Sequence, residues 1–337
     1  MKPWIYRGAS VFVSLLFVYL AVRQVDLSQA FGALAGIQPS VLGAATLVYL
    51  ASFPVRALRW RLVLRAQKTL TFGEMLGPVF VGYMANNVLP ARAGEIYRAH
   101  FLGRSADMSR SGVAASIVVE RAFDGLMMVA VMALVAAMFP EAHFLGVTAG
   151  IVALVFVLLA VGIALHSLAA GGTGDLSDRL IRRLPESLRE IIEARLKFFL
   201  QGMKGVSTAR EALATAGYTG AIWSLEFLAL ALAVYSFGVS IPFAGYALVF
   251  ALTALGTTLP SGPGYVGPYQ YAFVLSLGVF DVARETALAI SVAAQICLLG
   301  SVTVIGLVLL LNAQLRSGAG LRNSMKSSKR TKGGNIG

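Results

Sequence analysis

Charged residues are scarce in this sequence. They make up 13% of its 337 residues, whereas about 25% is usual in a soluble domain. Hydrophobic residues account for 57%, and the mean hydropathy is +0.76. This composition excludes an ordinary soluble domain and indicates a membrane protein. The single cysteine, Cys297, excludes an intramolecular disulfide and says nothing about the redox compartment.

Nucleotide-binding and metal-binding motifs are also lacking. The sequence has no G-x-x-x-x-G-K motif, so ATP-driven transport by this chain alone is not expected. His100, His143 and His166 are scattered, without the spacing of metal ligands. We therefore expect no metal and no cofactor.

Positive charge is in excess, with 28 Lys and Arg against 16 Asp and Glu, a net charge of +12. The basic residues lie in the gaps between apolar runs, which favours membrane topology and anionic headgroups over nucleic acid. We expect membrane lipids with an anionic phosphate headgroup as partners, and no nucleic acid.

The apolar runs predict an all-α polytopic membrane protein with about six transmembrane helices. The first run resembles a signal peptide, but an uncleaved helix suits the later topology better. The basic stretch Arg56–Arg65, with Trp60 as an anchor, is interpreted as the cytoplasmic end of its span. The expected spans are 5–22, 37–55, 112–139, 144–168, 213–237 and 286–311.

Two further apolar segments are too short to span a membrane and are broken by Pro and Gly. They predict re-entrant hairpins at 76–103, on the cytoplasmic side, and at 244–280, on the outer side. Broken backbone at membrane depth is tolerated where it is buried in protein or lines a wet cavity. The expected hinge residues are Pro90, Gly94, Pro260, Gly262, Pro263, Gly264 and Gly267.

This topology leaves only Arg23 and Arg284 of the basic residues outside, with both termini in the cytoplasm and the chain in the cytoplasmic (inner) membrane. Both breaks share the pattern L-P-x-x-x-G, which suggests an inverted repeat made of 1–143 and 144–312. Residues 175–210 predict an amphipathic helix, either lying on the membrane or binding a regulator. The basic tail, 313–337, is expected to be disordered.

Ionisable residues near the first break are the strongest site candidates. Arg92 suits a lipid phosphate, and Glu95 would either hold Arg92 or meet a cationic group. Glu120 and Asp124 are four residues apart and share a helix face. They would share a proton, bind a cation, or belong to an ion-pair network that joins Arg121 to Glu95.

Other candidates are more ambiguous. Glu226 is alone in its span and is either protonated or paired with an arginine that the sequence does not identify. Asn87 either caps the broken helix or binds headgroup oxygens. Tyr265, Tyr269 and Gln270 either line the far side of a cavity or belong to an interfacial aromatic belt.

Three motifs resemble the flippase-like family that includes the membrane portion of lysylphosphatidylglycerol synthases. They are Asn87-x-x-Leu-Pro-x-Arg92-x-Gly94-Glu95, then Val119-Glu120-Arg121-x-x-Asp124, and Pro-Ser-Gly-Pro-Gly264-x-x-Gly267. The resemblance implies a membrane-embedded lipid translocase with two re-entrant segments. One departure is that Pro268 and Tyr269 stand where the family has an aromatic–acid pair.

The sequence thus predicts a translocase for a phospholipid or a polyprenyl-phosphate-linked lipid. One alternative is an integral-membrane transferase acting on a lipid-linked substrate, with the carboxylates as general base. Another is a non-catalytic partner of a lipid-synthesis enzyme. If the chain is a lipid translocase, we expect it to have no catalytic residue. A homo-oligomer is one candidate for its assembly.

Overall fold

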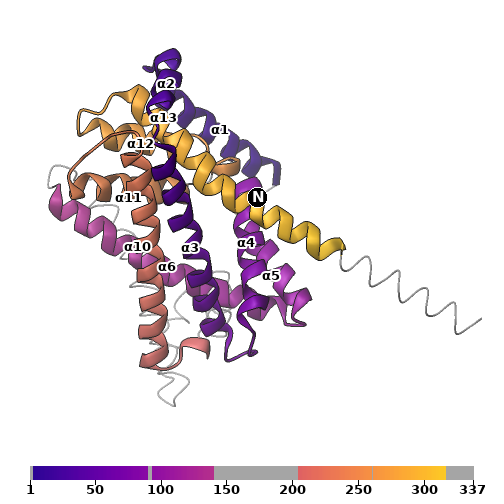
Figure 1. Cartoon of the computed structure of the whole chain (residues 1–337). Helices are drawn as coiled ribbons and strands as arrows, with labels where there is room; N and C mark the ends of the chain where they lie inside the picture. The colour runs from indigo at the N-terminus through magenta and orange to yellow at the C-terminus, as the bar shows by residue number, and fades with distance from the viewer. Residues whose placement is uncertain (1–2, 90–92, 140–203, 260, 316–337) are drawn as a thin grey trace, which may run out of the picture.

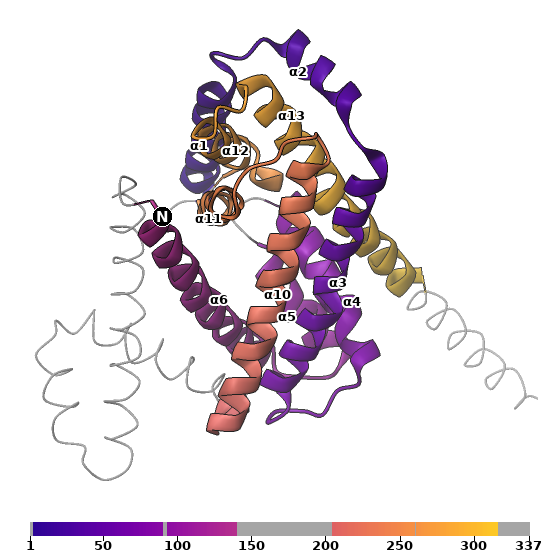
Figure 2. The same ribbon diagram turned by 60° about the vertical axis from the view of Figure 1, so that its left-hand side comes forward.

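A computed structural model describes residues 3–89, 93–139, 204–259 and 261–315, and every regular element in these ranges is helical. Figures 1 and 2 show long helices crossing one another, with shorter helices packed at either end. The first half contains α1 (Pro3–Val22), α2 (Leu27–Ala33), α3 (Pro39–Leu64), α4 (Phe72–Val88), α5 (Gly94–Ser105) and α6 (Arg110–Met138). The second contains α10 (Ala209–Tyr235), α11 (Phe243–Thr258), the short helix η5 (Pro263–Tyr265), α12 (Pro268–Gly278), α13 (Arg284–Ala294) and the π-helix η6 (Gln295–Leu299).

Four helices of the described part are long and apolar enough to cross a membrane: Pro39–Leu64, Arg110–Met138, Ala209–Tyr235 and Arg284–Leu315. A fifth is possible if Ser10–Val22 and Leu27–Gly36, which meet at an angle of 81°, form one broken span. The described part of the chain is therefore all-helical, and the protein is a multi-pass membrane protein. The expected count of six includes 144–168, which lies outside the described residues, as do the amphipathic helix up to residue 203 and the tail from residue 316.

The helix starts follow local sequence signals. Thr71 caps α4 by accepting a hydrogen bond from the Glu74 amide, while the Glu74 carboxylate accepts one from the Thr71 amide. Thr208 and Glu211 make the same reciprocal pair at the start of α10. The predicted amphipathic helix therefore cannot run unbroken to residue 210, because Ser207 and Thr208 are not helical and Thr208 caps α10.

One interpretation of the sequence was wrong in part. The stretch Arg56–Arg65 does lie at the end of a span, but α3 includes it up to Leu64, and Arg61 and Arg65 are exposed there. Arg59 and Trp60 are fully buried, and Arg56 is 6% exposed. The extra turns of α3 carry these side chains into the bundle, where carboxylates from other helices neutralise the two arginines. Arg56, Arg59 and Trp60 are therefore interior residues and do not anchor the chain at an interface.

Both predicted breaks are present as helix–break–helix segments. The helices α4 and α5 pack on each other around the first break, and α11 and α12 pack on each other around the second. In Figures 1 and 2, α4–α5 lies towards the end of the bundle where α3 ends, while α11–α12 lies towards the end that holds α2. This is the placement that an inverted repeat requires, and the repeat itself stays a prediction.

The core joins the two halves of the chain. α3 and α10 pack along each other, and the largest buried cluster combines Leu42 and Ala45 of α3 with Leu230 of α10 and Phe273 of α12. A second cluster packs Phe53 and Trp60 of α3 against α4, α5 and α6. α3 and α10 thereby form the pair of helices from which side chains reach the centre of the molecule.

Candidate functional site

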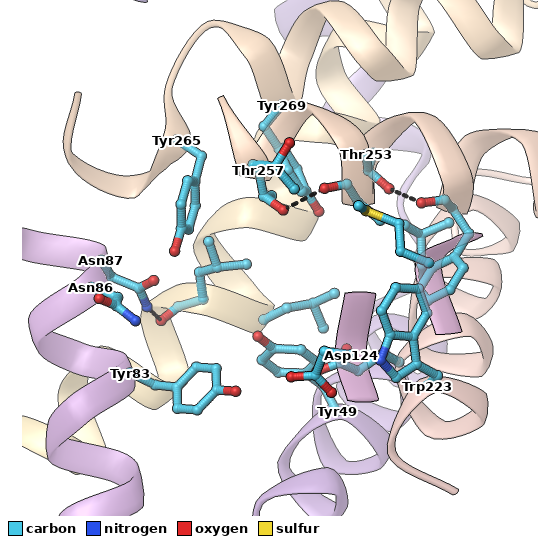
Figure 3. Close-up of a pocket in the computed structure, with 18 of the residues that line it drawn as sticks. Tyr49, Tyr83, Asn86, Asn87, Asp124, Trp223, Thr253, Thr257, Tyr265 and Tyr269 are labelled. Carbon is cyan, nitrogen blue, oxygen red and sulfur yellow. Dashed lines mark hydrogen bonds between the residues drawn. The ribbon is translucent and has the colours of Figure 1, made fainter. Parts of the chain in front are cut away.

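The bundle encloses a central cavity of about 450 Å³ between its two broken segments. This volume lies within the roughly 300–1,000 Å³ of typical ligand pockets. Figure 3 shows Tyr83, Asn86 and Asn87 at the left of the cavity, Tyr265, Tyr269 and the threonines of α11 along its top, and Asp124 below, beside Tyr49 and Trp223. The cavity is lined from both halves of the chain, by Tyr49, Arg56, Tyr83, Asn86, Asn87, Glu95, Arg121, Asp124, Gly125, Met128, Trp223, Glu226, Leu230, Phe250, Thr253, Ala254, Thr257, Thr258, Tyr265, Tyr269, Leu298 and Leu299.

Arg56 joins three helices in the wall of this cavity. Its guanidinium pairs with the carboxylate of Glu226 on α10 and donates a hydrogen bond to the hydroxyl of Tyr83 on α4. The guanidinium carbon also lies 4.7 Å from the centre of the Tyr83 ring, which adds a cation–π contact. Glu226, alone in its span by sequence, therefore has an arginine partner.

Glu120 lies in the most deeply buried part of the charged region. Its Oε1 lies 3.4 Å from Nε of Arg59, its Oε2 lies 2.8 Å from Nη2 of Arg98, and each of the three side chains is at most 4% exposed. The Arg98 guanidinium stacks over the ring of Trp60 at 3.5 Å. The indole N–H of Trp60 donates in turn to the Ser116 hydroxyl, at 2.9 Å. Glu120 thus supports the cavity wall from behind and does not line the cavity.

Asp124 connects the buried pairs to the cavity. Its carboxylate lies 2.5 Å from Nη1 of Arg59 and 3.2 Å from Nη2 of Arg121. Arg121 Nε lies 3.5 Å from Oε1 of Glu95, at the start of α5. The predicted link from Arg121 to Glu95 is therefore confirmed, and it ties α6 to the helix after the first break.

We call this set of paired side chains the charged cluster. It consists of Arg56, Arg59, Arg98 and Arg121 together with Glu95, Glu120, Asp124 and Glu226. The formal charges cancel, so a buried arrangement of many ions carries no net charge. Desolvated ions are tolerated at such depth only when paired in this way.

The opposite side of the cavity contains uncharged polar groups, and we call it the neutral wall: Thr253, Thr257, Tyr265 and Tyr269. Behind it, a chain of amide hydrogen bonds holds the second break. The Gly267 amide donates to Gln270 Oε1 at 2.8 Å, Gln270 Nε2 donates to Gln295 Oε1 at 2.5 Å, and Gln295 Nε2 donates to the Gly264 carbonyl at 2.6 Å. We call this chain the glutamine ladder.

Two glycines make the second break possible. Gly264 and Gly267 have φ values of +69° and +101°, a conformation that side chains with a Cβ rarely adopt. A Cβ on Gly267 would also meet the backbone carbonyl of Ser14 on α1. Ser14 itself accepts a hydrogen bond from the Gly262 amide and donates one to the Val266 carbonyl, at 2.7 and 2.8 Å. The first helix therefore fixes the second break from outside.

The first break is joined to the last long helix through Asn87. Its side-chain amide donates to the Leu299 carbonyl at 3.2 Å and to the Thr303 hydroxyl at 3.0 Å. Gln295 and Leu299 are the ends of the π-helix η6, a distortion that is frequent at functional sites. This one turn thus contacts both breaks, Gln295 the second and Leu299 the first.

The structure sorts the predicted substrate-binding residues into three groups. Those that line the cavity are Asn87, Glu95, Arg121, Asp124, Glu226, Tyr265 and Tyr269. Glu120 and Gln270 lie behind the walls, as partners of buried groups. Arg92 lies outside the described residues, as do the hinge candidates Pro90 and Pro260.

The sequence analysis missed Arg56, Arg59 and Arg98 as site residues. Arg56 and Arg59 were assigned to an interface because they belong to a dense basic run, and Arg98 was given no role of its own. A usable signal was present, since Glu120, Asp124 and Glu226 lie within apolar spans and each requires a cation at the same depth.

Comparison with known proteins gives a family and one distant relative. Residues 8–306 match the family model of the lysylphosphatidylglycerol synthase TM region. Glycosyltransferase AglD of Haloferax volcanii is 26% identical over 354 aligned residues, which cover 91% of this chain and 54% of AglD. The chain thus spans about half the length of this curated relative. No solved structure matches significantly.

Proposed function

The chain belongs to the lysylphosphatidylglycerol synthase TM region family, and from that premise we propose that its cavity receives the polar headgroup of a membrane lipid for a transferase. The observation that carries this proposal is the central cavity itself. It places ions, tyrosines and threonines around about 450 Å³ inside an apolar helix bundle. A headgroup is polar and its tails are apolar, so such a cavity would replace water around the headgroup while the tails stay in lipid.

The chemistry of the cavity supports binding more than catalysis. A general base needs a carboxylate that is free to accept a proton. Glu95, Asp124 and Glu226, the acids that line the described cavity, each lie against an arginine. Their ion pairs favour a fixed, charge-balanced binding surface. We therefore propose that the chain presents a lipid-linked substrate, and that a partner enzyme or a further part of the protein supplies the reaction.

The names of the relatives support the same role. The description of the family names a synthase, and AglD is named as a glycosyltransferase. The match covers 54% of AglD, so the named activity of that protein need not lie in the shared part. One name refers to the synthesis of a phospholipid and the other to glycosyl transfer, which favours the transferase-related alternative over a translocase that works alone.

Translocation of the lipid between leaflets is the second candidate function. It is favoured by the position of the cavity between two broken segments at opposite ends of the bundle. Broken segments that flank a central site are typical of alternating-access transporters. The two candidates differ in whether a headgroup, once bound, leaves towards the opposite leaflet.

Purified chain in proteoliposomes separates the candidates. Lipids of anionic, zwitterionic, cationic and polyprenyl-phosphate type would be tested for binding, for movement between leaflets, and as acceptors with sugar-nucleotide or aminoacyl donors. We expect binding, lost in Arg121→Gln and kept in Glu285→Gln, and no transfer by the chain alone. Leaflet movement would select translocation, whereas transfer by the purified chain would contradict a presenting role. Absence of binding by every lipid class would overturn the proposal.

A further inference from the structure

A second cavity, of about 620 Å³, lies between α3 and α10. It is at the end of the bundle where α3 ends and α10 begins, away from the central cavity. Its polar side is formed by Arg61, Arg65 and Arg210, with Glu211, and we call it the basic groove. No part of the function proposed above uses these residues.

The charges in the basic groove do not balance, unlike those of the charged cluster. Arg65 pairs with Glu211 at 2.8 Å. Arg61 and Arg210 are exposed and make no hydrogen bond or ion pair within the described residues. Two cationic side chains therefore remain available to one ligand, and the planar guanidinium group can bind a phosphate through two parallel hydrogen bonds.

Apolar side chains line much of the rest of the groove, together with Thr69 and Thr208. Leu58 and Leu62 lie on the same face of α3 as Arg61 and Arg65, because residues three and four apart share a helix face. Ala214 and Tyr218 form the matching side of α10. Both helices are candidate membrane spans whose arginines stand at the same end, so the groove leads from the cationic group along apolar side chains towards the interior of the bilayer.

We propose that the basic groove binds an anionic phospholipid, with the phosphate between Arg61 and Arg210 and an acyl chain along Leu58 and Leu62. A freely soluble anion would use the arginines and leave the apolar surface unoccupied. Basic recesses between membrane helices are suited to anionic headgroups. The bound lipid would hold α3 against α10, the two helices that carry Arg56, Arg59 and Glu226 into the charged cluster.

The test measures stabilisation of the purified full chain in neutral detergent as lipid is added. Phosphatidylglycerol, phosphatidylcholine and inorganic phosphate are titrated separately, and the midpoint of thermal unfolding gives an apparent Kd for each. Arg61→Gln with Arg210→Gln is compared with Arg23→Gln plus Arg104→Gln, which removes the same charge at exposed positions outside the groove. We expect the groove variant to bind phosphatidylglycerol about tenfold more weakly, and the control to bind like the original chain.

A second variant tests the apolar part of the groove. Ala214→Trp fills the space beside Leu62 without removing a charge, and the exposure of Ala214 leaves room for folding. We expect it to lose phosphatidylglycerol binding. Equal affinity of the original chain and the groove variant, equal weakening in the control pair, or equal stabilisation by phosphate and phosphatidylglycerol would each overturn the proposal. Since neither variant alters the central cavity, these results are independent of the headgroup experiment above.

Discussion

The two sides of the central cavity stabilise buried polar groups with different chemistry. Each side lies beside a broken helix whose polar groups are inside an apolar bundle. The charged cluster beside the first break uses guanidinium–carboxylate pairs from α3, α5, α6 and α10. The second break uses neutral amides, left-handed glycines and the Ser14 hydroxyl.

The difference has consequences for stability. A buried ion must have a partner, and removing one member leaves an uncompensated charge at a cost of about 3–5 kcal/mol. A neutral hydrogen bond contributes only about 0.5–1.5 kcal/mol. Loss of one buried member of the charged cluster should therefore cost much more unfolding free energy than loss of one neutral hydrogen bond at the second break. The predictions below test this contrast.

Glu120→Gln should have the largest effect. It removes the negative charge that Arg59 and Arg98 share in a site at most 4% exposed, so we expect a loss of about 3–5 kcal/mol of unfolding free energy. Unfolding of the purified chain by denaturing detergent measures this loss. Glu95→Gln, in a pair about 30% exposed on both sides, is the matched control and should lose much less. Equal losses in the two variants would show that burial does not control the cluster.

Gly267→Ala should come next. The φ of +101° at Gly267 and the nearby Ser14 carbonyl are both unfavourable for a residue with a Cβ. We therefore expect the free energy of unfolding to fall by about 2–3 kcal/mol. The same detergent titration applies. Gly217→Ala, in α10 where nothing lies within 4 Å of an added Cβ, should be neutral or stabilising. A tolerated alanine at Gly267 would mean that the second break is not fixed by its backbone.

Gln295→Leu should weaken the second break less. It leaves the Gly264 carbonyl and the Gln270 amide without their partners, and we expect a loss of about 1–2 kcal/mol. The glutamine ladder is neutral, so the free energy of unfolding lost through Gln295→Leu should be the same with and without the additional substitution Glu95→Gln. Non-additivity of these two substitutions in a double-mutant cycle would show instead that the two sides of the cavity are coupled.

Asn87→Ala should have the smallest effect, about 1 kcal/mol. It removes the contacts from the first break to Leu299 and Thr303, while each of these acceptors keeps the other hydrogen bonds of its helix. Proteolysis at the first break is the sensitive measurement, because local opening there should increase more than global unfolding. An unchanged rate of proteolysis would show that Asn87 contributes to the cavity and does not stabilise the first break.

Sequence alone predicted much of this arrangement and failed in a specific way. The Pro and Gly pattern located both breaks, and an ion pair between Arg121 and Glu95 was one of the alternatives that the sequence suggested and the structure contains. The burial of Arg56, Arg59 and Trp60 was missed because the sequence does not show that α3 continues to Leu64 within the bundle. The partners of Glu226 and Gln270 depend on packing between distant helices, which local patterns do not encode.

The central claim is that a lipid headgroup enters the cavity, and site-specific photo-crosslinking tests it most directly. A diazirine analogue of methionine at position 128 would face the cavity, which Met128 lines. Leu126, two residues away on α6, is 52% exposed, so a diazirine side chain in its place would face the outside of the bundle. After irradiation in native lipid, mass spectrometry identifies which part of the lipid is attached. The account predicts headgroup adducts at position 128 and acyl-chain adducts at position 126. Acyl-chain adducts at both positions, or none at position 128, would contradict it.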